Sequence, residues 1–139
     1  MKELFTIEDV LVKSITLHSD ERGTLGFLHS EDEVPYTIER TFFVTSSNKK
    51  ARGSHAHKEC WQSLLCLQGG IDVSLHDGSE HKVVNLSSPE SLLVIPPTIW
   101  AKQVGLKDSN LLIVFCSHKY DSGDYLHSID DLNQYRKSI

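Results

Sequence analysis

The sequence lacks a long apolar run, an extended basic tract and a large excess of charge of either sign. A membrane-spanning helix needs about 20 mostly apolar residues, and no stretch approaches that length. The net charge of -5 gives no general attraction to nucleic acid or to an anionic membrane. Residues 1–9 carry acids where a signal peptide would carry its apolar region. We therefore expect a cytoplasmic protein, with neither nucleic acid nor a membrane as a partner.

Cysteine is also scarce, because the chain has only Cys60, Cys66 and Cys116, and none forms a CxxC pair. Cys66 and Cys116 lie in apolar runs typical of strands, where a reduced and buried thiol is the ordinary interpretation. Stability must then come from a hydrophobic core, and a chain of 139 residues is long enough to build one. With no repeat and no linker, we expect a single domain over residues 1–139.

The apolar pattern is predominantly that of β structure, with turn signals about every ten residues. An Asp77-Gly78 pair marks a hairpin, and residues 128–135 form the one good helix candidate, with Ser128 or Asp130 as its cap. About ten short strands and a terminal helix predict an all-β jelly-roll sandwich or small barrel. The expected strands cover residues 10–17, 24–28, 38–45, 61–68, 71–75, 81–86, 91–95, 100–104 and 111–117.

The stretch from Arg52 to Lys58, Arg-Gly-Ser-His-Ala-His-Lys, holds the most informative residues. In a strand, His55 and His57 share a face about 6–7 Å apart. Such a pair suits a metal site, a proton relay or a solvated polar loop.

A metal site needs more donors than the sequence places near this pair. Gln62 stands where a carboxylate ligand is expected, and no histidine occurs between Pro96 and Lys102. Two imidazoles and a neutral amide form a poor site for Zn²⁺ or Fe²⁺. Glu59 reaches the same face only if the strand stays regular, so we expect no metal.

Proton transfer suits the pair better, because histidine can both take and give a proton near neutral pH. Two imidazoles on one face span neighbouring substrate carbons, as isomerisation beside a carbonyl requires. Side chains that could converge on the same concave face would contact an anion, donate an amide hydrogen bond and offer a stacking surface. These side chains are Arg52, Lys58, Gln62 and Trp100.

Several spaced motifs, in order, resemble the nucleotide-sugar 3,4-ketoisomerases, which are small cupins. The motifs are Arg22-Gly23, Ile38-Glu39-Arg40, Arg52 to Lys58, Gln62, Leu65-Cys66, Asp77-Gly78, Ile95-Pro96-Pro97 with Trp100, and Tyr120-Asp121 with Asp124-Tyr125. The resemblance covers about residues 18–135. It implies a cupin-type jelly roll that assembles as a homodimer with exchanged strands.

The resemblance also implies an activity that needs no metal or other cofactor. The substrate would be a dTDP-4-keto-6-deoxyhexose, converted to its 3-keto isomer for an amino or deoxy sugar of a surface polysaccharide such as an O-antigen. By position, His55 is the expected base at C3 and His57 the partner that delivers the proton to C4. The expected substrate contacts are Arg22, Arg40, Arg52, Lys58, Gln62, Trp100, Lys102 and Tyr120.

Three places depart from the family pattern. Phe42-Phe43 replaces tyrosines, Ala101 stands where a histidine or arginine is usual, and His127 replaces an arginine. The substitutions leave open an altered sugar or product, or a binding module without catalysis. A metal-dependent cupin enzyme is a separate alternative.

Overall fold

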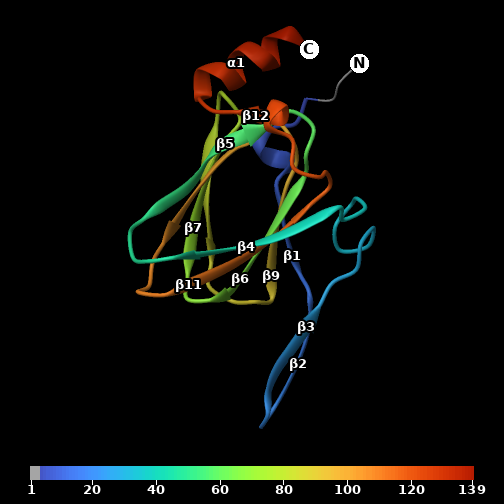
Figure 1. The fold of residues 1–139 in the computed structure, drawn as a ribbon, viewed down its shortest axis with the longest axis vertical. Helices are drawn as coiled ribbons and strands as arrows, with labels where there is room; N and C mark the ends of the chain where they lie inside the picture. Colours follow the sequence, from blue (N-terminus) through green and yellow to red (C-terminus); the bar gives the residue numbers. More distant parts are fainter. Residues whose placement is uncertain (1–3) are drawn as a thin grey trace.

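Two five-stranded antiparallel sheets face each other in the computed structural model, which describes residues 4–139 (Figure 1). Residues 1–3 of the N-terminal stretch considered above lie outside the described residues. One sheet has the order β1-β9-β6-β11-β4 and the other β12-β5-β10-β7-β8. The first sheet consists of β1 (Leu11–Ser14), β9 (Ser91–Ile95), β6 (Gln62–Gln68), β11 (Asn110–Cys116) and β4 (Arg40–Ser46). The second sheet consists of β12 (Tyr125–Leu126), β5 (Ala51–His57), β10 (Trp100–Gly105), β7 (Ile71–His76) and β8 (His81–Leu86).

Strand β11 shows how alternation builds the space between the sheets. Its residues Leu112, Val114 and Cys116 are buried in the main core, whereas Ile113 and Phe115 point to the other face of the sheet. Burial of one side chain in every two is the pattern of a strand in a sandwich. The all-β jelly roll expected from the sequence is therefore confirmed.

The first sheet is covered on its outer face as well. Val34 is fully buried there against Leu65 and Leu92, within the segment that connects the β2–β3 hairpin to β4. Burial on both faces explains why β6 and β9 are apolar without alternation.

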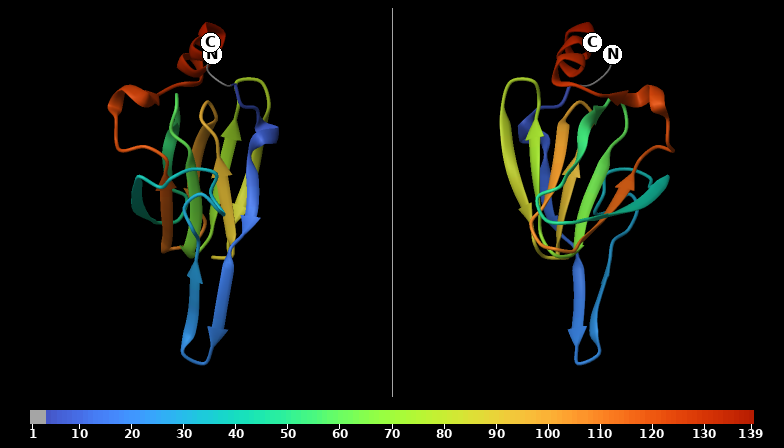
Figure 2. Two further views of the ribbon diagram at one scale, coloured as in Figure 1. Left: turned by 90° about the vertical axis from the view of Figure 1, so that its right-hand side faces the viewer. Right: turned by 60° about the vertical axis from the view of Figure 1, so that its left-hand side comes forward.

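A single strand predicted over residues 10–17 is wrong, because the chain forms two strands there. Strand β1 pairs with β9, whereas β2 (Thr16–Asp20) pairs with β3 (Gly23–Phe27) in a separate hairpin. Ile15 lies buried between them, and its amide donates to the Glu90 carbonyl oxygen. Figure 2 shows the hairpin projecting away from both sheets.

Helix α1 (Ile129–Ser138) begins where the sequence predicts it, with the Ser128 side chain accepting a hydrogen bond from the Asp131 amide. Two short 3-10 helices were not predicted: η1 (Ile7–Asp9) and η2 (Ser122–Asp124). Among residues 4–139, no helix combines the length and apolar character needed to cross a membrane.

Helix α1 covers part of the outer face of the second sheet. Leu132 is fully buried there with Ala56 and Leu126, and Trp100 packs against the same cluster. The residue between the two histidines of β5 therefore faces the helix. His55 and His57 consequently share the opposite face of the strand.

Candidate active site

A break in the pairing of β5 with β10 decides which side chains join His55. Ala101 lies opposite His55, but Gln103 lies opposite Arg52, so the register shifts by one residue. Gly53 sits within this bulge with a φ of 89°, a conformation that glycine adopts readily. Because directly paired residues share a face, the bulge places Arg52 on the same face as His55. Simple alternation would have placed it on the other.

His55 lies in a half-buried position beside His57, with 5.1 Å between the ring centroids. Burial, together with the positive charges of His57, His127 and Arg40, lowers the pKa of His55 to about 4. A neutral imidazole results near pH 7, which is the form that can accept a proton.

His57 is nearly fully buried and is oriented by Asp124, with 3.0 Å between Nδ1 and a carboxylate oxygen. Burial would raise the pKa of Asp124, but hydrogen bonds from His57 and the backbone amides of Glu59 and Cys60 hold it below its usual value. The Nε2 atom of His57 is buried and has no hydrogen-bond partner among the described residues. Because buried polar atoms in folded proteins are generally paired, this nitrogen is available to a ligand or a neighbouring group.

Tyr125 covers the two histidines from β12, which pairs with β5 directly at His57. Its ring centroid lies 4.8 Å from that of His55 and 4.5 Å from that of His57, and the exposed His127 ring stacks on it at 5.9 Å. An aromatic wall of this kind restricts both imidazoles and keeps water from one side of them.

Arg40 supplies a positive charge at the same place. Its guanidinium lies 5.5 Å from the Phe42 ring centroid and 5.7 Å from that of Tyr120, and its Nε is buried without a hydrogen-bond partner in the described chain. An unpaired guanidinium nitrogen is suited to an anionic oxygen of a ligand.

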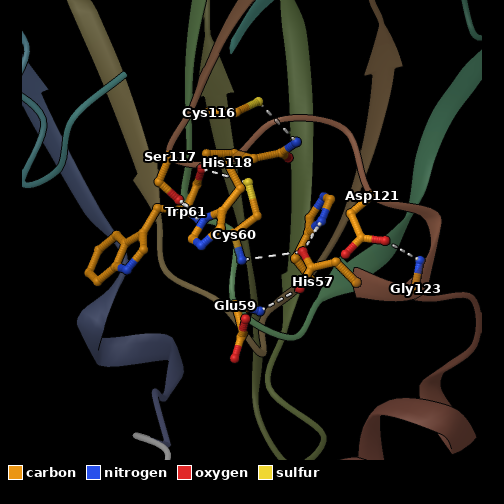
Figure 3. A network of polar contacts seen from close by, with 11 residues as sticks. His57, Glu59, Cys60, Trp61, Cys116, Ser117, His118, Asp121 and Gly123 are labelled. Atoms are coloured by element: carbon orange, nitrogen blue, oxygen red, sulfur yellow. Dashed lines mark hydrogen bonds and ion pairs between the residues drawn. The ribbon is translucent and has the colours of Figure 1, made fainter. Parts of the chain in front are cut away.

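Two buried thiols, those of Cys60 and Cys116, lie to one side of His57 (Figure 3). The Cys116 thiol interacts with Cys60 and lowers the pKa of Cys60, with a further contribution from the charge of His57 and opposition from burial. The Gln62 amide nitrogen contacts the Cys116 sulfur at 3.7 Å. The reduced and buried thiols expected at Cys66 and Cys116 are confirmed, and Cys60 is free and buried as well.

Several predicted site residues therefore lie near one another through shared strand faces and ring contacts: His55, His57, Arg40, Arg52, Gln62 and Tyr120. Of these, Gln62 is buried against Cys116, and Tyr120 is 68% exposed at the margin.

Four other candidate substrate contacts lie apart from the histidines within the single chain, so the suggested convergence of Lys58 and Trp100 with the histidines is wrong there. Trp100 and Lys102 pair with His76 and Ser74 on the outer face of the second sheet. Lys58 lies over the Tyr135 ring of α1, at 5.7 Å from its centroid. Arg22 is bound to Asp20 at the tip of the projecting hairpin. Strand alternation separates the first three from the histidines, and the hairpin carries Arg22 away.

Asp124 and Tyr125 are the residues that sequence reasoning left out of the candidate site. Both belong to the Tyr120-Asp121 to Asp124-Tyr125 motif, so a signal was present, but 67 residues separate Asp124 from His57. Only the pairing of β12 with β5 brings them together.

Asp124 also changes the inventory of possible metal ligands. His57, Cys60 and Asp124 offer donor atoms within 4.8 Å of one another, and a second group, His29, Asp32 and Glu33, lies at the surface. The carboxylate that Gln62 does not supply is thus present in the fold.

Comparison with known proteins places the chain in a family. The family model described as FdtA, WxcM-like, C-terminal, matches residues 8–137. The TDP-4-oxo-6-deoxy-alpha-D-glucose-3,4-oxoisomerase of Aneurinibacillus thermoaerophilus is 31% identical over 121 residues, which cover 86% of this chain and 87% of that protein. The chain belongs to the FdtA/WxcM-like family.

Solved structures of similar proteins extend the comparison to three dimensions. A histidine-to-asparagine mutant of the 3,4-ketoisomerase QdtA from Thermoanaerobacterium thermosaccharolyticum, in complex with TDP-4-keto-6-deoxyglucose, has a TM-score of 0.88 at 27% identity, covering 94% of this chain and 96% of that one. The WlaRB TDP-quinovose 3,4-ketoisomerase from Campylobacter jejuni has a TM-score of 0.86 at 28% identity, covering 92% of this chain and 99% of that one. The cupin-type jelly roll that the resemblance implied is therefore confirmed for this FdtA/WxcM-like chain.

Proposed function

We propose that this protein is an isomerase that moves the keto group of a dTDP-4-keto-6-deoxyhexose from C4 to C3. The observation that carries the proposal is the pairing of His55 with a second histidine, His57, that is oriented by Asp124. The named relatives, which are TDP-sugar 3,4-ketoisomerases, support the substrate class.

The reaction begins at C3, whose hydrogen is acidified by the neighbouring 4-keto group. The neutral imidazole of His55 accepts this proton, and the electrons of the C–H bond form an enediolate shared by C3 and C4. The Arg40 guanidinium, with its unpaired buried Nε, stabilises the developing negative charge on oxygen.

Protonation at C4 then completes the transfer and leaves the carbonyl at C3. His57 accepts the proton from His55 at its unpartnered Nε2 and returns it to C4, while Asp124 fixes the orientation of the His57 ring through Nδ1. No step calls for oxidation or for a Lewis acid, since the keto group and Arg40 supply the polarisation. We therefore propose that catalysis is independent of a metal.

Deuterium incorporation tests the proposal directly. Protein incubated with dTDP-4-keto-6-deoxyglucose in deuterium oxide should give a 3-keto product with solvent deuterium at C3 or C4, followed by NMR and mass spectrometry. His55→Asn should abolish both product and label. Unchanged and unlabelled substrate with folded wild-type protein would refute the proposed isomerase activity.

A binding module without turnover is the second candidate, and the position of Ala101 favours it. Ala101 lies opposite His55 and brings a methyl group where a polar side chain would reach the substrate. Phe43 does not bear on the question, because it is 71% exposed on the outside of β4. Calorimetry separates the candidates: a binding module would bind dTDP-sugar without turnover and retain binding in His55→Asn.

A further inference from the structure

His57, Cys60 and Asp124 together have the composition of a metal site. They come from the end of β5, the connection to β6, and η2, and their donor atoms lie within 4.8 Å of one another. We propose that this cluster binds Zn²⁺ on the Nδ1 side of His57, and that bound zinc inhibits the enzyme. The inhibition rests on the proposed function, whereas the binding does not.

The donor set selects zinc over the hard cations. An imidazole nitrogen, a thiolate and a carboxylate oxygen are common zinc ligands, and three protein ligands leave a fourth tetrahedral position for water. Mg²⁺ and Ca²⁺ prefer oxygen alone. None of these ligands belongs to the outer surface, because His57 and Cys60 are buried and Asp124 is largely covered.

The protein already holds the carboxylate in place for such an ion. The backbone amides of Glu59 and Cys60 donate to Asp124 at 2.8 and 3.3 Å. Outer contacts of this kind fix a ligand and strengthen metal binding.

A surface hollow borders Asp124. A hollow of about 570 Å³ is lined by Asp124 and by three further carboxylates, those of Glu39, Glu59 and Asp121. Lys119 and His118 also line it, so its charge is mixed, but the carboxylates outnumber the lysine. The local field therefore favours a cation near Asp124.

Zinc at this position would prevent His57 from accepting a proton at Nε2. The metal would replace the proton that Nδ1 shares with Asp124, and that proton would move to Nε2 through solvent. The Cys60 thiol, where protonated, would release its proton to water. An Nε2 that carries hydrogen is no longer a proton acceptor, so the relay stops without oxidation or reduction of any group.

The test begins with chelator-treated protein and no substrate. Titration with zinc chloride, followed by calorimetry, should show one saturable site, and Co²⁺ should give the charge-transfer absorption of a thiolate ligand. Cys60→Ser should remove that absorption and weaken zinc binding more than the roughly 10- to 100-fold expected for loss of an outer contact. Cys60→Ala serves the same purpose if the serine variant does not fold.

Two matched variants identify the site. Cys66→Ser removes another buried thiol, which lies within β6, donates to the Gln68 carbonyl oxygen and is not part of the ligand group, and it should leave zinc binding unchanged. His29→Ala removes a ligand of the exposed group and should also have no effect. No binding, or binding lost in His29→Ala but kept in Cys60→Ser, would overturn the site.

Activity measurements then address inhibition. One equivalent of zinc should abolish isomerisation in wild-type and Cys66→Ser protein, and a chelator should restore it. Zinc that binds as described but leaves the rate unchanged or raises it would overturn inhibition. If the protein has no isomerase activity at all, the proposed function fails while the binding result stands.

Discussion

His55 and His57 are adjacent in space but differ in what surrounds them. His55 is half-buried and faces positive charge from His57, His127 and Arg40. His57 is nearly enclosed and paired with a carboxylate. The first environment disfavours an imidazolium at His55, whereas the carboxylate of Asp124 fixes the orientation of the His57 ring.

The pKa of His55, lowered to about 4, predicts how the activity depends on pH. An ordinary histidine would be protonated progressively below pH 6.5 and would lose its function as a base there. In metal-free protein we expect kcat/KM to keep the neutral-imidazole contribution down to about pH 5 and to lose it as the pH falls through about 4. An NMR titration, assigned with His55→Asn, measures this pKa directly.

The same shift affects stability in a defined direction. Because the folded pKa lies below the unfolded value, the unfolded chain binds the proton first as the pH falls from 6.5 towards 4. His55 should therefore destabilise the fold across that window, and His55→Asn should lessen the acid sensitivity. A His55 resonance that titrates near pH 6.5 in folded protein would contradict the assignment of its environment.

Asp124→Asn tests the orientation of His57. The amide keeps the size of the side chain but cannot stabilise a protonated imidazole, so kcat should fall by about 10²-fold or more while KM changes little. Asp121→Asn is the matched control, since Asp121 is an exposed carboxylate in the same segment that caps η2. Equal losses in the two variants would show that the segment, and not the Asp124 charge, is what matters.

At the scale of elements, the bulge in β5 joins sequence to site. Arg52 shares the face of His55 only because Gly53 adopts a φ of 89° and shifts the register. Helix α1 then supports the back of the same strand through Leu132 and Ala56. The site thus depends on the bulge near the start of β5 and on the packing of α1 against the end of the same strand.

Gly53→Ala should strain this bulge. A side chain at that φ costs about 1–2 kcal/mol, and the new Cβ would lie 3.0 Å from the Gln103 side chain, which is flexible enough to move. We expect a loss of about that size in the free energy of unfolding, measured by denaturant titration, together with weaker binding of dTDP-sugar through Arg52. Gly70→Ala is the control, because its φ is not positive and its nearest neighbours lie 3.8 Å away.

Much of this arrangement could be predicted from sequence, and the failures have physical causes. Alternation and turn residues located most strands and the helix, and they placed His55 and His57 on one face. Trp100 and Lys102 were misplaced because nothing in a local pattern tells which face of β10 meets the histidines. Asp124 was missed as a partner because a contact across 67 residues depends on pairing of β12 with β5.

At the scale of the whole molecule, the β2–β3 hairpin is incomplete by itself. It projects from the sheets (Figure 2), and Leu25 and Phe27 on β3 are 61% and 40% exposed. An isolated two-stranded hairpin is marginally stable in water, so these side chains require a covering surface. Edge strand β1 also exposes Leu11 and Val12.

A second copy of the chain would cover these surfaces, in keeping with the predicted homodimer with exchanged strands. Light scattering coupled to size exclusion should give twice the chain mass, and Leu25→Asp should weaken the dimer at least about tenfold, since a charge cannot be buried there without a partner. Val83→Asp is the matched control for Leu25→Asp, because Val83 is 58% exposed on β8 of the second five-stranded sheet. This variant should leave the dimer intact. A monomeric wild type, or equal dissociation in both variants, would contradict an interface built on the hairpin.

Because Arg22 is carried at the tip of this hairpin, loss of dTDP-sugar affinity in dimer-deficient Leu25→Asp would further indicate that Arg22 acts in the site of the partner subunit.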